Sequence, residues 1–267
     1  SIRFIQTTGA GFDSVDHLTA AELGIPVSNS PNMNASSVAE YVMAAIVNLQ
    51  RGLAWADGEI RRGRYAASRA ELLEQGGLEL RGCRIGLFGL GNIGRAVVPL
   101  AKAFGCSVAA CDAFWPEEFA AENGVERMDV AELFAECDVV SLHCPLTDET
   151  YHMINKDTIA QMKDDVILVN TSRGALVDSE ELIQGIRQGK FFGVGLDVYE
   201  EEGDNVFENR EDELLQHSIT ARLLSFPNVI ITSHQGFLTR EALAAISRTT
   251  LQNAVDYENR TIHEANQ

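Results

Sequence analysis

The sequence has no run of apolar residues long enough to span a bilayer, and nothing in it resembles a secretory signal. It is also short of cations, with 21 lysines and arginines against 39 aspartates and glutamates and a formal net charge of −18. So acidic a chain is a poor partner for nucleic acid or an anionic membrane. The charge mainly implies solubility, and positive potential at an anion site would have to come from individual arginines and helix ends.

The cysteines and histidines lack the spacings of a disulfide framework or a metal site. The five cysteines are scattered, and no two of them form a C-x-x-C pair: Cys83, Cys106, Cys111, Cys137 and Cys144. This pattern predicts reduced thiols in a cytoplasmic protein, most of which serve as small core residues. The histidines show no metal-ligand spacing, so no metal is expected.

A glycine-rich segment is the most informative feature of the chain. Gly89-Leu90-Gly91-Asn92-Ile93-Gly94 follows the apolar run Arg84–Phe88 and precedes a helical stretch from Ala96 to Phe104. The next apolar run, Ser107–Cys111, ends at Asp112. This succession of strand, glycine turn, helix, strand and acid is typical of a dinucleotide site.

Each residue of this pattern has a separate physical reason. Gly89 permits a tight turn, Gly91 lets the backbone approach a pyrophosphate, and Gly94 lets helix and strand pack closely. The pyrophosphate would lie on the helix N-terminus, where the dipole favours anions, and Asn92 and Ile93 within the turn are also assigned to the cofactor site. Asp112 would accept hydrogen bonds from the ribose hydroxyls and repel a 2′-phosphate, so the expected cofactor is NAD rather than NADP.

From Arg84 onward, apolar strands alternate with helical segments, which predicts a doubly wound parallel sheet of the Rossmann type. The predicted strands are Arg84–Phe88, Ser107–Cys111, Val139–His143, Val166–Asn170, Val194–Asp197 and Val229–Thr232. The predicted helices between them include Val130–Ala135, Lys156–Met162 and Ser179–Gln188. We assign residues 36–235 to a dinucleotide-binding domain with this α/β fold.

Residues 1–35 and 236–267 are assigned to a second α/β domain, flavodoxin-like and incomplete, that would bind the substrate. It holds one strand–helix–strand unit (Ile2–Gln6, Asp16–Leu23, Ile25–Ser28) and a final helix, Arg240 to Tyr257. The dinucleotide-binding domain begins with Ser37-Val38-Ala39-Glu40, which has the form of a capping box and predicts a helix that runs to Arg51. A basic amphipathic segment, Trp55 to Tyr65, then suggests a subunit contact.

Three further segments resemble a known family. They are Asn170-Thr171-Ser172-Arg173-Gly174, Leu196-Asp197-Val198-Tyr199-Glu200-Glu201-Glu202 and Pro227-Asn228-Val229-Ile230-Ile231-Thr232-Ser233-His234-Gln235. With the glycine turn and Cys144-Pro145 they resemble the NAD-dependent D-2-hydroxyacid dehydrogenases. The segment after Glu202 and Gln235-Gly236-Phe237-Leu238-Thr239 are most similar to the D-lactate dehydrogenase branch. The resemblance implies reduction of a small 2-keto acid to a D-2-hydroxy acid, in a homodimer or a higher homo-oligomer.

The chemistry expected of three residues also follows from their side chains. Arg173 can grip a carboxylate at two points and keeps its charge. His234 can supply a proton, because its ordinary pKa lies near neutrality. A nearby carboxylate would hold the ring in one tautomer and favour its charged form, and Glu202 matches the family's glutamate. Its neighbours Glu200 and Glu201 are alternatives for that role.

The resemblance also implies contacts to cofactor and substrate. Asp197 is expected to face the nicotinamide carboxamide, while Thr171, Cys144 and Pro145 would line the cofactor. The backbone of Ala10 and Gly11 would hold the substrate carboxylate, and Phe237 would border the substrate's side chain. The remaining histidines have no such context and are expected to be structural or exposed: His17, His143, His152, His217 and His263.

Two departures from the family pattern affect these expectations. The lactate branch carries a Tyr-Ser-Pro segment whose tyrosine helps to hold the carboxylate, and this chain has Met33-Asn34-Ala35 there. The family also has strands and helices ahead of the position of Ile2, so we expect this chain to bind NAD(H) but to reduce 2-keto acids poorly. An interaction protein resembling the C-terminal-binding-protein corepressors is the alternative function on the same fold.

Overall fold

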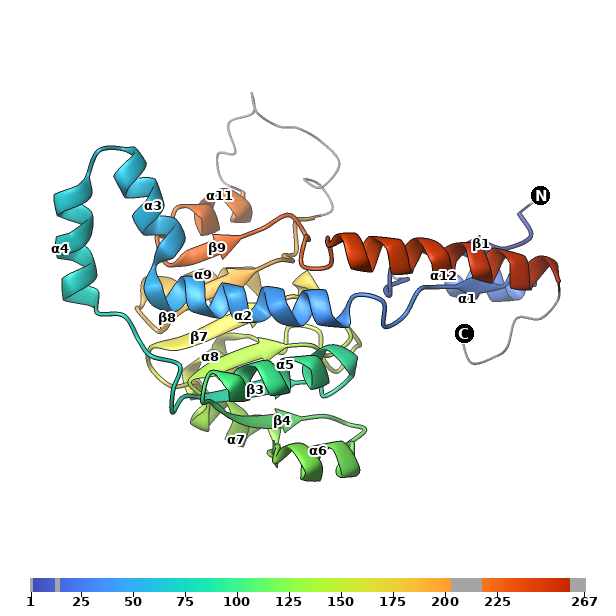
Figure 1. The fold of residues 1–267 in the computed structure, drawn as a ribbon, viewed down its shortest axis with the longest axis horizontal. Coiled ribbons are helices and arrows are strands. Elements are labelled where there is room, and N and C mark those ends of the chain that lie inside the picture. Colours follow the sequence, from blue (N-terminus) through green and yellow to red (C-terminus); the bar gives the residue numbers. More distant parts are fainter. Residues whose placement is uncertain (1, 13–14, 203–217, 260–267) are drawn as a thin grey trace. The chain divides into compact units, whose positions relative to one another are not determined.

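A computed structural model describes residues 2–12, 15–202 and 218–259. The chain divides into two compact units, one formed by Ser1–Val38 and Phe237–Gln267 and the other by Ala39–Gly236. Figure 1 shows the elements of both units. Within the described residues no helix is long and apolar enough to cross a membrane.

The large unit is built on one parallel sheet, which in the described residues has seven strands in the order β5-β4-β3-β6-β7-β8-β9. The strands are β3 (Arg84–Phe88), β4 (Ser107–Cys111), β5 (Glu126–Arg127), β6 (Val139–Leu142), β7 (Val166–Asn170), β8 (Phe191–Leu196) and β9 (Val229–Ile231). The order reverses direction between β3 and β6, which places a crevice at their carboxyl ends. The predicted doubly wound sheet is confirmed.

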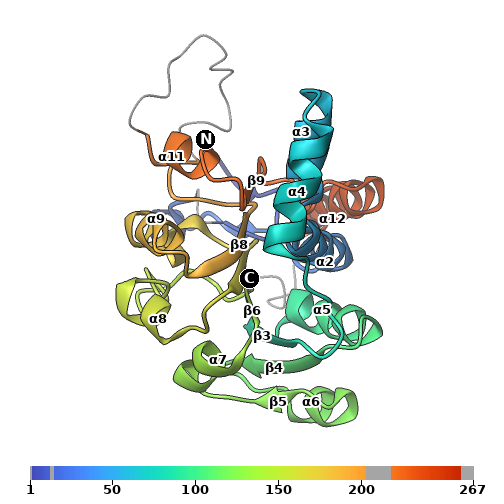
Figure 2. The same cartoon turned by 90° about the vertical axis from the view of Figure 1, so that its left-hand side faces the viewer.

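Helices cover both faces of this sheet (Figure 2). One face carries α5 (Asn92–Ala103) and α2 (Ala35–Arg51), most of which belongs to this unit. The other carries α7 (Val130–Glu136), α8 (Lys156–Gln161) and α9 (Ser179–Arg187). Further helices are α3 (Leu53–Arg61), α4 (Tyr65–Gln75), α6 (Glu117–Asn123) and α11 (Ile219–Leu224), and a 3-10 turn, η1, spans Gly174–Leu176.

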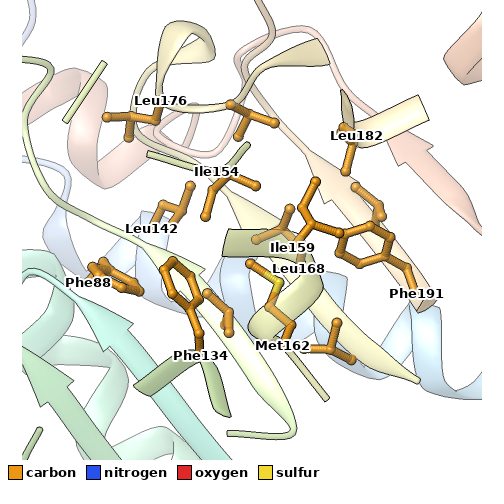
Figure 3. Close-up of a cluster of buried hydrophobic side chains, with 14 of the residues drawn as sticks. Phe88, Phe134, Leu142, Ile154, Ile159, Met162, Leu168, Leu176, Leu182 and Phe191 are labelled. Carbon is orange, nitrogen blue, oxygen red and sulfur yellow. The ribbon is translucent and has the colours of Figure 1, made fainter. Parts of the chain in front are cut away.

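The main apolar core lies between the sheet and α7, α8 and α9 (Figure 3). Phe88 on β3 packs against Phe134 on α7 with ring centroids 4.9 Å apart. Leu142, Leu168 and Leu196 continue this layer from strand to strand, each at most 2% exposed. Phe88, Leu142 and Leu196 are the last residues of their strands, so the core gives the loops at the carboxyl edge a rigid base.

Two local predictions about helix starts are wrong. Helix α5 begins at Asn92 rather than at Ala96, because Gly91 already acts as its N-cap. Helix α2 begins at Ala35, so Ser37 lies inside the first turn and does not cap it. The hydroxyl of Ser37 instead hydrogen-bonds Thr239 Oγ1 at 2.8 Å, a tertiary partner that competes with the capping arrangement.

The described residues of the small unit form a two-stranded parallel sheet, the helices α1 and α12, and the first residues of α2. Strands β1 (Ile5–Gln6) and β2 (Val27–Ser28) are shorter than predicted, while α1 (His17–Glu22) and α12 (Arg240–Glu258) match the prediction closely. Asn253, 5% exposed on α12, donates to Gln6 Oε1, Ser28 Oγ and the Asn29 carbonyl at 2.9–3.0 Å. This amide therefore attaches α12 to both strands.

Candidate active site

The glycine turn leaves strand β3 and leads directly into α5. Gly89 has a φ of +96°, which favours glycine, and its N–H donates to the Cys111 carbonyl at 2.8 Å. A Cβ on Gly94 would lie 2.3 Å from the Gly89 carbonyl oxygen, so helix and turn are in backbone contact there. Gly91 caps α5 with no side-chain bond, and nothing lies within 4 Å of where its Cβ would be. The end of the helix thus has the open space that a pyrophosphate requires.

Asp112 is held at the edge of this turn. One carboxylate oxygen accepts from Leu90 N at 2.6 Å and the other from Phe114 N at 2.7 Å. A carboxylate oxygen has two lone pairs, so each still has room for a ribose hydroxyl. The residues at this position therefore fit the adenosine half of NAD.

The loops after β6 and β7 are tied together. Ser172 Oγ donates to the Cys144 carbonyl at 2.6 Å. The buried side chain of Asn170 accepts a hydrogen bond from Ser172 N and donates one to the Arg173 carbonyl. These bonds fix Thr171 beside the segment Cys144-Pro145. Sequence reasoning did not single out Asn170 or Ser172, although both lie within the matched motif.

Two buried polar atoms in these loops have no protein partner: Thr171 Oγ1 and His143 Nδ1. Buried polar groups are nearly always hydrogen-bonded, so their positions at neighbouring strand ends mark a surface that a polar ligand would complete. Burial lowers the pKa of His143 to about 4, and the ring is therefore neutral near pH 7. Its Nε2 lies 2.9 Å from Ser141 Oγ.

His234 and Glu202 are brought together from the ends of β9 and β8. His234 Nδ1 lies 3.4 Å from Glu202 Oε2. This contact raises the pKa of His234, while partial burial and the positive charge of Arg173 act in the opposite direction. The protonated ring is favoured beside the carboxylate, as a proton donor requires. Arg173, from the loop after β7, is within electrostatic reach of the pair.

The loop that carries His234 is shaped by Asp197. This carboxylate, 2% exposed, accepts from Thr232 Oγ1 at 2.6 Å and from the backbone N–H groups of Gln235 and Gly236 at 2.8 Å. His234 itself has a φ of +53°, and its N–H donates to the Asp197 carbonyl at 2.9 Å. A strained conformation of this kind persists only where its surroundings enforce it.

Helix α2 contributes to the same network, because the Tyr41 hydroxyl hydrogen-bonds Thr232 Oγ1. No motif indicated this role for Tyr41 or Thr232. The contact between Asp197 and nicotinamide stays a prediction, since the carboxylate oxygens are used here to hold the loop.

Comparison with known proteins agrees with this geometry. The model of the "D-isomer specific 2-hydroxyacid dehydrogenase, NAD binding domain" matches residues 43–236. The D-lactate dehydrogenase of Escherichia coli K12 is 41% identical over 257 residues, which cover 96% of this chain and 76% of that protein. The chain belongs to the NAD-dependent D-2-hydroxyacid dehydrogenases.

Other relatives of the dehydrogenase differ in the substrate that they are named for. The "Aromatic 2-oxoacid reductase" of Clostridium sporogenes is 38% identical over 96% of this chain and 76% of its own length. The structure of D-lactate dehydrogenase from Aquifex aeolicus complexed with NAD and lactic acid superimposes with a TM-score of 0.87 at 33% identity, over 97% of this chain and 77% of that one. The dehydrogenase thus spans about three quarters of the length of these relatives, and its expected fold and cofactor are confirmed.

Three of the expected substrate contacts, Ala10, Gly11 and Phe237, lie in the small unit of the dehydrogenase. The Ala10 carbonyl accepts from Asn29 Nδ2 at 2.7 Å, and Gly11 follows it in the same loop. Phe237 lines a cavity of about 410 Å³ with Thr8 and α12 side chains such as Ile246. The assignment of these residues to the substrate stays a prediction.

Among the described residues, no cluster of three or more histidine, cysteine or acidic side chains could hold a metal ion. His217, His263 and residues 203–217 of the segment after Glu202 lie outside the described residues. The five cysteines are free thiols, of which Cys106 and Cys137 are buried as expected and the others partly so.

Proposed function

We propose that this dehydrogenase reduces pyruvate or a similarly small 2-keto acid to the D-2-hydroxy acid. The observation that carries the proposal is the pairing of His234 with Glu202 beside Arg173, at the carboxyl ends of neighbouring strands. Relatives named D-lactate dehydrogenase support a small substrate, whereas relatives named aromatic 2-oxoacid reductase support a larger, aromatic one as the alternative.

NADH, held by the glycine turn and Asp112, would supply the hydride for the keto carbon. The guanidinium of Arg173 binds the substrate carboxylate at two points and so orients the keto group. His234 donates a proton to the keto oxygen, which becomes the hydroxyl, and the neutral ring is reprotonated from solvent. Glu202 keeps the ring charged and oriented until that transfer takes place.

The remaining polar groups would position these three and bind the cofactor. Asp197 holds the loop that carries His234 in its strained conformation. Gly89, Gly91, Asn92, Ile93, Gly94 and Asp112 would bind the pyrophosphate and ribose of NAD, and Cys144, Pro145 and Thr171 would line the nicotinamide half. Ala10, Gly11 and Phe237 would contact the substrate.

The proposed assembly is a cytoplasmic homodimer. Helices α3 and α4 extend away from the sheet of the large unit (Figures 1 and 2) and expose large apolar side chains, among them Ile60, Tyr65 and Leu73. A second copy of the chain would cover such a surface. Light scattering of Leu73→Glu should give a smaller mass than the unchanged protein, and an unchanged mass would exclude this contact.

The decisive assay measures NADH oxidation with pyruvate, longer aliphatic 2-keto acids and phenylpyruvate. We expect the highest kcat/KM for the smallest substrate and formation of the D-enantiomer. His234→Ala should abolish turnover of every substrate while NADH binding, followed by fluorescence, stays close to that of the unchanged protein. Preference for phenylpyruvate would overturn the small-substrate assignment, and turnover by the histidine variant would overturn the mechanism.

A further inference from the structure

The turn that carries Glu202 is held by three successive glutamates with three different partners. Glu202 N donates to the Tyr199 carbonyl at 3.1 Å, which closes the turn. Glu201 accepts from Thr220 N and Oγ1 at the start of α11, and Glu202 pairs with His234. Glu200 accepts from His152 Nε2 at 2.7 Å and from Ser179 N at 3.0 Å. The Glu200 anchor joins the turn to His152 in the loop before α8 and to Ser179 at the start of α9.

The same turn lies in direct contact with the loop that carries Arg173. A Cβ on Gly174 would fall 2.3 Å from the Tyr199 carbonyl carbon and 2.7 Å from Glu200 N. Residue 174 can approach so closely only because it is glycine. A shift of the turn would therefore displace Glu202 and press on the residue next to Arg173.

His152 lies where these segments meet, and its own backbone is fixed. It has a φ of +49°, its N–H donates to the Ala175 carbonyl at 2.9 Å, and its carbonyl accepts from Asn155 Nδ2 at 2.9 Å. A second backbone hydrogen bond joins the same two segments: Ile154 N donates to the Leu176 carbonyl at 3.0 Å. The imidazole thus projects from a backbone that is joined to the segment following Arg173.

The side chain of His152 lies between two carboxylates. Nε2 contacts Glu200, Nδ1 lies 3.5 Å from Asp178 Oδ2, and the ring stacks on Tyr151 with centroids 4.0 Å apart. The side chains of His152, Asp178 and Glu200 are all about three quarters buried. Burial raises the pKa of Glu200, but the bonds from Ser179 and His152 outweigh that effect and leave it below its ordinary value. The carboxylate is therefore charged and available to grip the imidazole.

We propose that His152 is a positioning residue of this dehydrogenase: by holding Glu200 it fixes the turn Tyr199–Glu202 and thereby places Glu202 opposite His234. The inference rests on the proposed roles of Glu202 and His234 in the reaction. Glutamine at position 152 could still donate one hydrogen bond to Glu200, whereas alanine could not.

The test follows the imidazole of His234 directly, by NMR titration of the histidine side chains in the unchanged protein, His152→Ala and His152→Gln. The spectrum of His234→Ala assigns its resonance. Loss of the His152 anchor should let Glu202 withdraw, which removes the effect that raises the pKa of His234. We expect a lower titration midpoint in His152→Ala and a midpoint near that of the unchanged protein in His152→Gln.

Kinetics supply the second readout. Reduction needs protonated His234, so the pH above which kcat/KM falls should move down in His152→Ala in step with the NMR midpoint. Asp129→Ala, which removes the capping box of α7 away from the site, is the stability-matched control and should leave both readouts unchanged. If His152→Ala does not fold, Glu200→Gln should lower both readouts in the same direction.

An unchanged His234 midpoint in a folded His152→Ala protein would overturn the proposal, even if its Tm were reduced. The same holds if His152→Gln behaves like the alanine variant. The proposed function fails separately: an unchanged protein that reduces no 2-keto acid, but whose His234 midpoint responds to His152, would refute the reaction and leave the positioning role intact.

Discussion

Replacing Gly94 by alanine should damage both the fold and the cofactor site. The new Cβ would lie 2.3 Å from the Gly89 carbonyl oxygen, where real contacts are not closer than 3.0 Å, so turn and helix must separate by about 0.7 Å. Overpacking of this kind costs ~1–3 kcal/mol, and the better helix propensity of alanine returns at most ~1 kcal/mol. Because the clash is with a backbone atom, the cost lies toward the upper end of this range, and we expect a net loss of ~1–3 kcal/mol in the free energy of unfolding.

The matched variant is Gly91→Ala, which should reduce NADH affinity without reducing the stability of the fold. Nothing lies within 4 Å of its Cβ position, and its φ of −73° suits any residue. Its stability should therefore change by less than ~0.5 kcal/mol. NADH affinity should still fall by at least about tenfold, or ~1.4 kcal/mol, because the methyl group takes the space of the pyrophosphate.

Urea unfolding without cofactor and NADH fluorescence titration measure the two quantities. Gly58→Ala in α3, which also meets nothing within 4 Å, controls for helix propensity and should bind NADH normally. A Gly94→Ala protein as stable as the unchanged one would refute the close contact. A Gly91→Ala protein with unchanged NADH affinity would refute the placement of the pyrophosphate.

Four further substitutions test the other parts of the site. Glu202→Gln should lower the pH above which 2-keto acid reduction falls. The carboxylate raises the pKa of His234, and only the protonated ring, which is present below that pKa, can donate the proton. A pH–rate profile identical to that of the unchanged protein would contradict this. Arg173→Lys should reduce kcat/KM roughly 10- to 100-fold in steady-state assays, since a point charge cannot make the planar two-point grip. Asp112→Ala should reduce the preference for NADH over NADPH, measured as a ratio of Kd values, by about tenfold or ~1.4 kcal/mol. Asp197→Ala should lower the free energy of unfolding by roughly 2–4 kcal/mol in urea, because donors near His234 lose a buried acceptor.

The sheet could be predicted from sequence wherever its strands are buried on both faces. The bounds of β3, β4 and β7 coincide with those predicted, because strands covered on both sides appear as uninterrupted apolar runs. Strand β5 and helix α6 were missed. Both residues of β5 are exposed, so it carries no such run.

The candidate catalytic residues could be predicted because each lies in a short motif at a strand end. The motifs that directly follow β7, β8 and β9 are enough to identify Arg173, Glu202 and His234. In a parallel sheet the carboxyl ends of these strands lie at one edge, which brings the three residues together. Their catalytic roles stay predictions. The choice of Glu202 over its two neighbours is supported by its 3.4 Å contact with His234.

The sequence by itself determined the parallel sheet, the glycine turn with its acid and the motifs at the strand ends, since these depend on residues close together in the chain. Only the tertiary structure decided that Asp197 holds the His234 loop, that Tyr41 joins it from 191 residues away, and that His152 grips Glu200 across 48 residues. It also drew Ser37 away from its capping box to Thr239. A single polar side chain carries no pattern of its own, so its partner is known only once the chain is folded around it.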